Sequence, residues 1–291
     1  AYMERLPKPG ETLHGTDYIV GLGGKGANQA VAARKLGSDV AFICRIGPDD
    51  FGASARREIE SHGIDTNLML RDAEGDLTAA PVPEKFEGTL LVSPAFMGEF
   101  LGTALGCYAG DYALISDTSI WKDKLGQRVA SEGITLETRP LDERIVCGER
   151  FDINGFKSEN GVILRDGVLE SFCLSEYAAR KTGRTRAANQ SGAYFLRPGE
   201  KSLEELIAGI ENGILINRFS GGQPGASGDF NGVAKNSFLI KDGRLAGAVT
   251  ETMISGNFAA LLQNLRGISR ETACDGSTVL PWAAFDGVTV K

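Results

Sequence analysis

The spacing of apolar residues in the first 72 positions predicts strands that alternate with helices. Helical spacing occurs over residues 27–36, with Gly37 at the position of a C-terminal cap, and again over residues 52–61. Short apolar runs predict strands at residues 17–20, 40–44 and 67–70. This alternation is typical of β-α-β units, so we expect a parallel sheet in this part of the chain.

The pattern changes at residues 71–87, which are polar, contain Pro81 and Pro83 and have no periodicity. Such a composition is typical of a domain boundary, and it predicts a linker over residues 73–87. The chain is then expected to consist of a partial α/β segment, residues 1–72, and a second domain, residues 88–291.

Beyond the linker the pattern is that of β-hairpins with a few helices. Asp166-Gly167 and Asp242-Gly243 each separate two apolar runs, and Asp-Gly favours the two-residue turn whose twist matches that of paired strands. Ser202, with Glu205 three residues later, predicts a helical capping box. Further helices are expected at residues 94–105 and 257–265. We therefore expect an α+β fold with mostly antiparallel pairing for residues 88–291.

Composition limits the classes of function. The chain has 291 residues, which suggests roughly two domains, and a net charge of −7, which argues against a nucleic-acid partner. No apolar run reaches the roughly 18 residues of a membrane span, and the first residues show no export signal. The five cysteines form no C-x-x-C pair. These features predict a cytoplasmic protein.

A glycine-rich loop precedes the first predicted helix. Residues 21–26 fit G-x-G-x-x-G, but the acidic residue that a dinucleotide site needs about 20 positions later is missing. A phosphate-binding P-loop is excluded because Lys25 is followed by Gly26 rather than Ser or Thr. On spacing alone, a plain glycine turn into a helix is favoured over either nucleotide site.

The longer string GGKGANQAVAA resembles the ribokinase/PfkB family of sugar kinases, and the resemblance covers about residues 4–70. It implies that a sugar contacts the loop through backbone amides and directional side-chain hydrogen bonds, from Gly23, Gly24, Lys25, Gly26 and Asn28. The family's opening strand, with its sugar-binding Asp, has no counterpart in the sequence. Residues 225–232 imitate the family's phosphate-binding turn, but a predicted strand follows them instead of a helix. A fragment of a carbohydrate kinase therefore remains the alternative function.

Residues 86–291 resemble the C-terminal domain of the TldD/PmbA family, metallopeptidases once described as modulators of DNA gyrase. The strings FEGTLLVSPAFMGEFLG, FDINGFKSENGVILRDGVLESFCLSEYAARKTG and GGQPGASGDFNGVAKNSFLIKDGRLAGAVTETMISGNF carry this resemblance. The ending CDGSTVLPWAAFDGVTV is closer to the PmbA, or TldE, branch.

The resemblance implies proteolysis by a hydrolase whose zinc is bound by an H-E-x-x-x-H helix in another domain. This chain has only His14 and His62, and neither begins such a motif. In the TldD branch a late cysteine contributes to the metal, and Cys274 lies in a comparable place. The expected protein has no metal or cofactor of its own, although the family uses zinc. It is expected to associate as a homodimer, or as a heterodimer with a TldD-like catalytic chain, so whether it is an enzyme stays open.

The same resemblance implies that the domain holds an unfolded peptide in extended form. Strand edges bind extended chains through main-chain hydrogen bonds. Our candidates for this role are Gly221, Gly222, Asn236, Ser237 and Phe238. The glycines alternatively only turn the chain between strands. Asp152, Glu159 and Asp229 are interpreted as solvated turn carboxylates rather than metal ligands. A third hypothesis is that the fusion has no function of its own.

Overall fold

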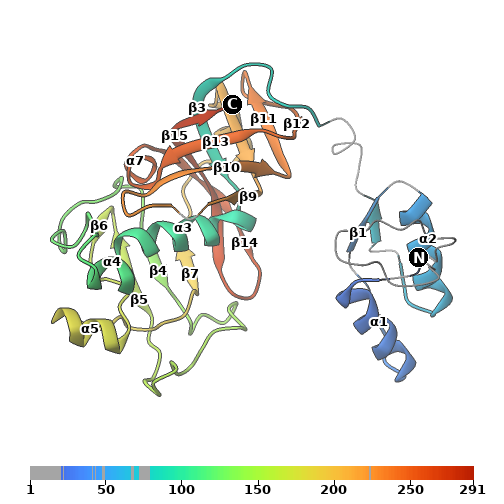
Figure 1. Ribbon diagram of the computed structural model, residues 1–291, viewed down its shortest axis with the longest axis horizontal. Helices are drawn as coiled ribbons and strands as arrows, with labels where there is room; N and C mark the ends of the chain where they lie inside the picture. Colours follow the sequence, from blue (N-terminus) through green and yellow to red (C-terminus); the bar gives the residue numbers. More distant parts are fainter. Residues whose placement is uncertain are drawn as a thin grey trace, which may run out of the picture. The chain divides into compact units, whose positions relative to one another are not determined.

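The structure is a computed structural model that describes residues 21, 23–40, 42, 44–47, 50–66, 69–71, 79–222 and 224–291. The chain divides into two compact units, Ala1–Leu77 and Thr78–Lys291, and each is described by itself (Figure 1). The division falls inside the predicted linker. None of the helices in the described ranges is long and apolar enough to cross a membrane.

The first unit contains one β-α-β arrangement. Strand β1 (Cys44–Ile46) leads to helix α2 (Asp50–Ser61) and then to strand β2 (Met69–Arg71), which pairs with β1 in parallel, as predicted. Helix α1 (Lys25–Lys35) precedes them. The small core of this unit consists of Ala27, Ala30, Ile59 and Ile64. The strand predicted at residues 17–20 lies outside the described residues.

The second unit is a 13-stranded, mostly antiparallel sheet with helices packed on it. Its main path runs in the order β12, β11, β8, β3, β15, β7, β4, β5, β6. Only the pairs β3–β8 and β15–β7 on this path are parallel. The bounds are β3 Phe86–Val92, β4 Leu136–Thr138, β5 Gly161–Arg165, β6 Val168–Leu169, β7 Tyr194–Leu196, β8 Asn212–Ile216, β11 Ser237–Lys241, β12 Arg244–Val249 and β15 Val279–Val290. The expected α+β class is confirmed.

Strand β15 is the branch point of the sheet. Along one side it pairs with β3, and along the other with β13 (Met253–Asn257) and β14 (Leu265–Cys274). Strand β10 (Asp229–Lys235) continues from β13, and β9 (Arg218–Gly221) pairs with β10. The branch therefore ends at β9.

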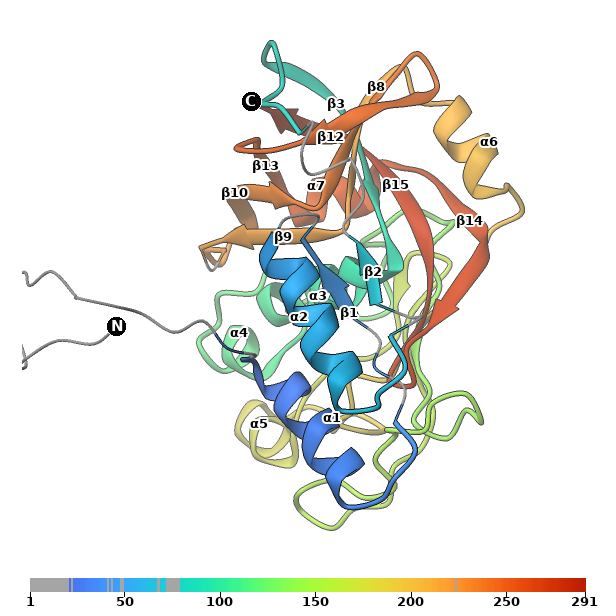
Figure 2. The ribbon, with the colours of Figure 1, turned by 90° about the vertical axis from the view of Figure 1, so that its right-hand side faces the viewer.

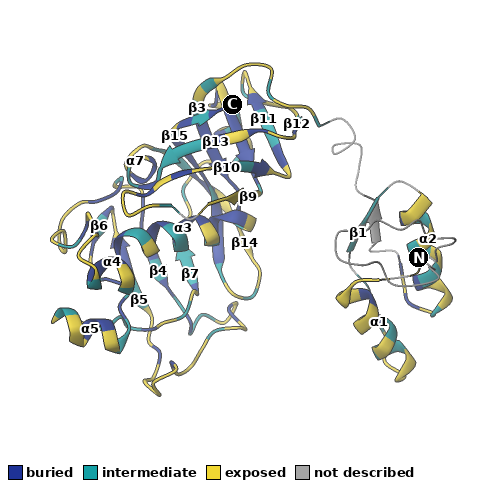
Figure 3. Cartoon of the chain, viewed as in Figure 1, coloured by how far each residue is buried: buried dark blue, intermediate teal, exposed yellow. Residues whose placement is uncertain are grey.

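Helix α3 (Pro94–Tyr108) crosses this sheet, with β9 and β10 on one side and β4 and β7 on the other (Figure 1). Pro94 occupies the first turn, where its missing N–H costs nothing. The helix is apolar on most of its faces and is therefore largely buried, as Figure 3 shows. The other helices of this unit are α4 Asp111–Ile115, α5 Glu176–Thr182, α6 Leu203–Ala208 and α7 Phe258–Gln263. Of these, α6 lies against β14 (Figure 2).

The predicted local signals are present. Asp166-Gly167 and Asp242-Gly243 have positive φ at both residues, the two-residue turn expected from Asp-Gly. Ser202 and Glu205 form the predicted capping box at α6. The helix expected at residues 257–265 ends earlier, at Gln263, because Leu265 already belongs to β14 and pairs with Phe285 of β15.

Candidate functional site

Short irregular segments cover most outer strand edges of the large sheet. Ala80 exchanges backbone hydrogen bonds of 3.2–3.3 Å with β12, and Lys201 accepts one of 2.7 Å from Arg270 of β14. Gly126 and Gln127 cover β6 through bonds of 2.7 and 3.0 Å to Leu169. Covered edges cannot pair with another chain.

Strand β9 is different. It pairs with β10 from Gly221↔Gly232 to Arg218↔Lys235, and within the described ranges no backbone group bonds to its other side. Three of its four residues are exposed. We call this unpaired side of residues 218–221 the β9 edge. It presents unpaired N–H and C=O groups, which form a template for an added strand.

A cavity of about 240 Å³ lies beside the β9 edge, between β9 and α3. Its apolar wall is aromatic and comprises Phe96, Phe100, Phe219, Phe230 and Phe258. These rings contact one another, with centroids 4.8–6.4 Å apart. Glu99, an exposed residue of α3, is the charged residue of the lining. The predicted peptide residues Gly221 and Gly222 also line this cavity.

The two glycines serve different purposes. A Cβ on Gly221 would lie 2.6 Å from Cζ of Phe219, whose ring also covers Gly232 on the paired strand. Glycine is therefore required at both positions to let the ring lie flat over the strand pair. At Gly222 a Cβ would meet no atom within 4 Å. Gly221 therefore belongs to the strand and is not merely a turn residue.

A second cavity, of about 450 Å³, continues along α3 and shares Thr103 and Pro224 with the aromatic one. No charged residue occurs in its described lining, which includes Gly102, Gly106 and Cys107. Burial raises the pKa of the Cys107 thiol, so this group stays protonated at neutral pH and is a poor nucleophile. The arrangement suits binding an extended chain rather than reacting with it.

The loop at residues 225–229, whose Gly225 and Ala226 line the second cavity, is fixed by a set of hydrogen bonds. Tyr108 Oη donates to Ser227 O at 2.9 Å and accepts from Ala259 N at 3.2 Å. Asn257 Nδ2 donates to Asp229 Oδ1 at 2.8 Å, and Ser227 Oγ donates to Asp229 Oδ2 at 2.7 Å. These bonds hold the pKa of Asp229 below its usual value. A strand, β10, follows this loop, as predicted. The loop therefore does not lead into a helix whose N-terminus could bind phosphate.

The predicted edge role of Asn236, Ser237 and Phe238 requires a correction. Strand β11 pairs with β8 on one side and β12 on the other, so its backbone offers no free edge. Asn236 lies just before it with φ 48°, and its carbonyl accepts a 2.7 Å bond from Asn217. An apolar strand pattern does not reveal how many neighbours a strand has, which is why the β9 edge could not be told from β11 in the sequence.

The surroundings of Cys274 do not fit a zinc site. Its Sγ lies 3.4 Å from the carbonyl oxygen of Arg144, whose guanidinium is paired with Asp142. That pairing lowers the pKa of Asp142 to about 2. Across the described ranges no group of three or more His, Cys, Asp or Glu is placed to hold a metal ion. A peptidase zinc needs about three protein ligands.

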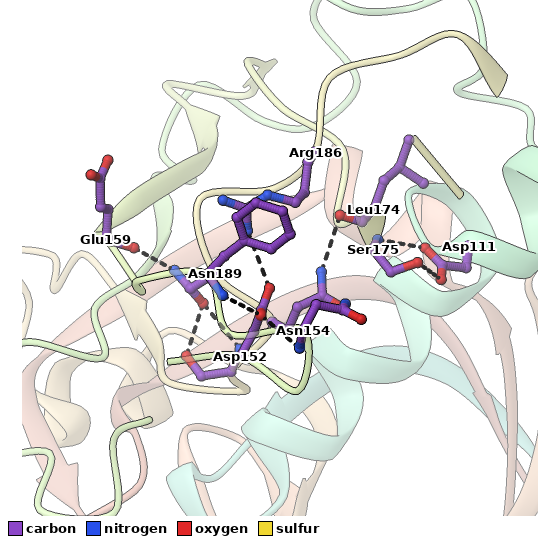
Figure 4. Close-up of polar contacts among 11 residues, drawn as sticks. Asp111, Asp152, Asn154, Glu159, Leu174, Ser175, Arg186 and Asn189 are labelled. Carbon is purple, nitrogen blue, oxygen red and sulfur yellow. Dashed lines mark hydrogen bonds and ion pairs between the residues drawn. The ribbon is translucent and has the colours of Figure 1, made fainter. Parts of the chain in front are cut away.

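Of the three carboxylates predicted to be solvated, Glu159 and Asp229 are exposed but Asp152 is not. The Asp152 side chain is 1% exposed and lies 3.3 Å from Arg186 Nη1 (Figure 4). Its Oδ1 also accepts backbone bonds of 2.9 Å from Asn154 and Phe156. The turn at Asp152 was predicted correctly. The burial of its carboxylate was not, because it depends on Arg186, which is distant in the sequence.

In the first unit, the predicted sugar-binding residues lie together at the start of α1. Gly24 caps the helix with φ 95°, and its carbonyl accepts a 3.1 Å bond from Asn28 N. Gly23, Lys25 and Gly26 are exposed beside it. Sugar contact by these residues stays a prediction.

Comparison with known proteins now places the chain in a class. The family model described as PmbA/TldA metallopeptidase C-terminal domain matches residues 86–291, and the chain belongs to this family. The model of the pfkB family of carbohydrate kinases matches residues 1–82.

Individual relatives belong to both groups. A metalloprotease of Methanothermobacter thermautotrophicus is 31% identical over 241 residues, which cover 77% of this chain and 51% of the relative. A ribokinase of Haemophilus influenzae is 56% identical over 59 residues, 20% of this chain and 19% of the relative. The crystal structure of a putative modulator of DNA gyrase from Bacteroides thetaiotaomicron has a TM-score of 0.67 at 27% identity, and it covers 81% of this chain and 51% of that chain. The chain thus spans about half the length of the metalloprotease relative.

Proposed function

We propose that residues 78–291 hold an unfolded peptide in extended form along the β9 edge. The observation that carries this proposal is the contrast between β9, which has no backbone partner on its outer side among the described residues, and β6, β12 and β14, whose edges are covered. A peptide strand added to β9 would form main-chain hydrogen bonds without regard to its sequence.

The aromatic cavity would add a preference for apolar side chains. Successive side chains of a strand point to opposite faces, so every second residue of an added peptide would face one side of the sheet. The ring centroids of Phe219 in β9 and Phe96 in α3 are 5.9 Å apart, so the aromatic wall lies on one face of the strand. Burying one apolar side chain there supplies about 1.5–3 kcal/mol. Glu99 at the rim favours a peptide without acidic residues.

The same domain is proposed to be a non-catalytic subunit within a cytoplasmic metallopeptidase. Among the described residues, the lining of the two cavities offers no side chain poised as a nucleophile, and the donors near Cys274 do not fit zinc. Zinc and the attacking water would then come from a partner, a TldD-like chain in a heterodimer, whereas a homodimer would only bind peptide.

The test uses a fluorescein-labelled ten-residue peptide in which leucine and glutamine alternate. Two isomers, N-methylated on alternate amides in either register, serve as matched controls, because only one set of amides faces the β9 edge. Fluorescence anisotropy with the full chain should show binding of the parent peptide. One isomer should bind at least tenfold more weakly, since it lacks about two hydrogen bonds. Equal binding of both isomers would rule out strand addition.

The non-catalytic part has its own test. The pure chain should neither hydrolyse unfolded peptides nor contain stoichiometric zinc, whereas a co-purified TldD-like chain should provide both. Zinc and turnover in the chain alone would contradict this part of the proposal and leave the peptide site intact.

The alternative, a carbohydrate-kinase fragment, concerns residues 1–82 and is supported by the pfkB match together with the exposed start of α1. Calorimetric titration of the full chain with ribose and with ATP separates the two. Ribose binding that is lost in Asn28→Ala would favour the kinase alternative, and the absence of binding to both ligands would end it.

A further inference from the structure

A third cavity, of about 380 Å³, lies on the other side of α3 from the β9 edge. Leu105 and Gly106 of α3 line it, together with Ile163, Gln190 and Tyr194. We call it the Tyr194 cavity. Gly102 and Gly106 also line the second cavity, so the two spaces meet over these glycines. Gly106 is exposed, and a Cβ there would meet no atom within 4 Å. The backbone of α3 is therefore open to a ligand at this residue.

The loop at residues 187–192, which lines the Tyr194 cavity, is held in place by hydrogen bonds within the protein. Asn189, which is 5% exposed, donates a 2.8 Å bond to Thr138 Oγ1. It also donates a 2.7 Å bond to Glu159 O (Figure 4). Gln190 Nε2 donates a 3.0 Å bond to Leu174 O. Because these bonds are internal to the protein, a ligand would not have to order the loop, and the cost of binding falls.

The hydroxyl group of Tyr194 is a hydrogen-bond donor that has no partner among the described residues. A Cβ added at Gly102 would lie 3.6 Å from this Oη, so the hydroxyl group lies close to α3. Burial raises the pKa of Tyr194 to about 12, so the hydroxyl keeps its proton at neutral pH. None of the described residues in the lining has a charged side chain. A charged ligand would therefore lose its hydration without gaining a partner.

We propose that the Tyr194 cavity binds an uncharged group that combines an apolar body with one hydrogen-bond acceptor, the chemistry of a neutral amide. A volume of about 380 Å³ admits one such group, at the lower end of small-molecule sites. One source is an apolar residue of the peptide that crosses α3 at Gly102 and Gly106, and this source rests on the proposed function. The other source is a free neutral amide.

The first experiment uses the full chain and the free probe N-acetylphenylalaninamide, with N-acetylaspartamide, which carries a free carboxylate, as the charged control. Calorimetry should detect binding of the first probe and not of the second. Tyr194→Phe should weaken binding roughly two- to tenfold, the effect of one neutral hydrogen bond. Gly106→Leu should abolish it by filling the space, and the fold should tolerate leucine because it favours helix over glycine.

Gly98→Ala is the matched control, because Gly98 lies on the same helix but lines none of the three cavities. It should bind the probe as the wild type does. Binding that is unchanged in both Tyr194→Phe and Gly106→Leu, or no binding at all, would overturn the proposal.

Variants of the ten-residue peptide distinguish the two sources, a residue of the bound peptide and a free neutral amide. Replacing one leucine at a time by aspartate in the ten-residue peptide should weaken binding where the peptide faces the aromatic cavity, in the wild type and in Gly106→Leu alike. It should weaken binding at one further position in the wild type and not in Gly106→Leu. If the free amide binds but the N-methylated isomers bind equally, the cavity stands and the proposed peptide function fails. If the peptide binds along β9 but neither the free amide nor this further position matters, the cavity proposal alone fails.

Discussion

Replacing Tyr108 by phenylalanine tests whether the loop beside the cavities is fixed by one hydroxyl group. Tyr108 is fully buried, and its Oη joins Ser227 O to Ala259 N near the start of α7. The substitution keeps the ring and its packing against Trp121, whose centroid lies 4.9 Å away. It removes only the oxygen.

The loss of the hydroxyl group affects its two hydrogen-bond partners differently. The Ser227 carbonyl keeps a 2.9 Å bond from Asn257 Nδ2, whereas Ala259 N–H has no other partner among the described residues and Ala259 is only partly exposed. An unsatisfied, partly buried donor costs about 1–2 kcal/mol. For a domain of this size that corresponds to a fall in Tm of about 2–8 °C.

Thermal unfolding followed by circular dichroism measures the change, with Tyr177→Phe as the control. Tyr177 is 65% exposed and its hydroxyl only accepts a 3.3 Å bond from Lys181, so that variant should stay within about 1 °C of the wild type. If Tyr108→Phe is as stable as Tyr177→Phe, the bridging bonds do not fix the loop and the argument is wrong.

Three other outcomes are expected. Gly221→Ala should lower the unfolding free energy by about 1–3 kcal/mol because its Cβ would overlap the ring that covers it, and Gly222→Ala, which meets nothing, should change it by less than about 0.5. Arg186→Ala should cost about 1–3 kcal/mol in denaturant unfolding, since it leaves the Asp152 carboxylate buried without its cation; a change below about 0.5 would contradict this. Because the folded chain raises the pKa of Tyr194 from 10.0 to about 12, stability should fall as the pH rises from 10 to 12, and this fall should be smaller in Tyr194→Phe; equal profiles would exclude this cause.

The sequence predicted the parts of the fold that depend on neighbouring residues. The Asp-Gly turns, the capping box at Ser202 and the β-α-β unit all follow from local backbone preferences. The same is true of the turn at Asp152, although its burial depends on Arg186, which lies 34 residues away.

The site was predicted in part for the same reason. Gly221 and Gly222 were identified, but the status of an edge depends on distant segments such as Ala80 and Lys201, which no local pattern announces. The Tyr194 cavity was missed, although α3 carries a usable signal. Gly102 and Gly106, which line the cavity, are four residues apart and therefore lie on one side of the helix.

The pairing of β3 with β15 has a consequence for how the protein is made. Thr89 and Asp286, joined by a 2.6 Å hydrogen bond across these strands, are 197 residues apart in sequence. At typical rates of translation, β3 leaves the ribosome about 10–40 s before its partner exists. During that interval Leu90, Leu91 and Val92, all buried in the finished sheet, are exposed to solvent. Nascent chains of this protein are therefore expected to be clients of chaperones, and the yield of native protein should depend on how well that waiting strand is shielded.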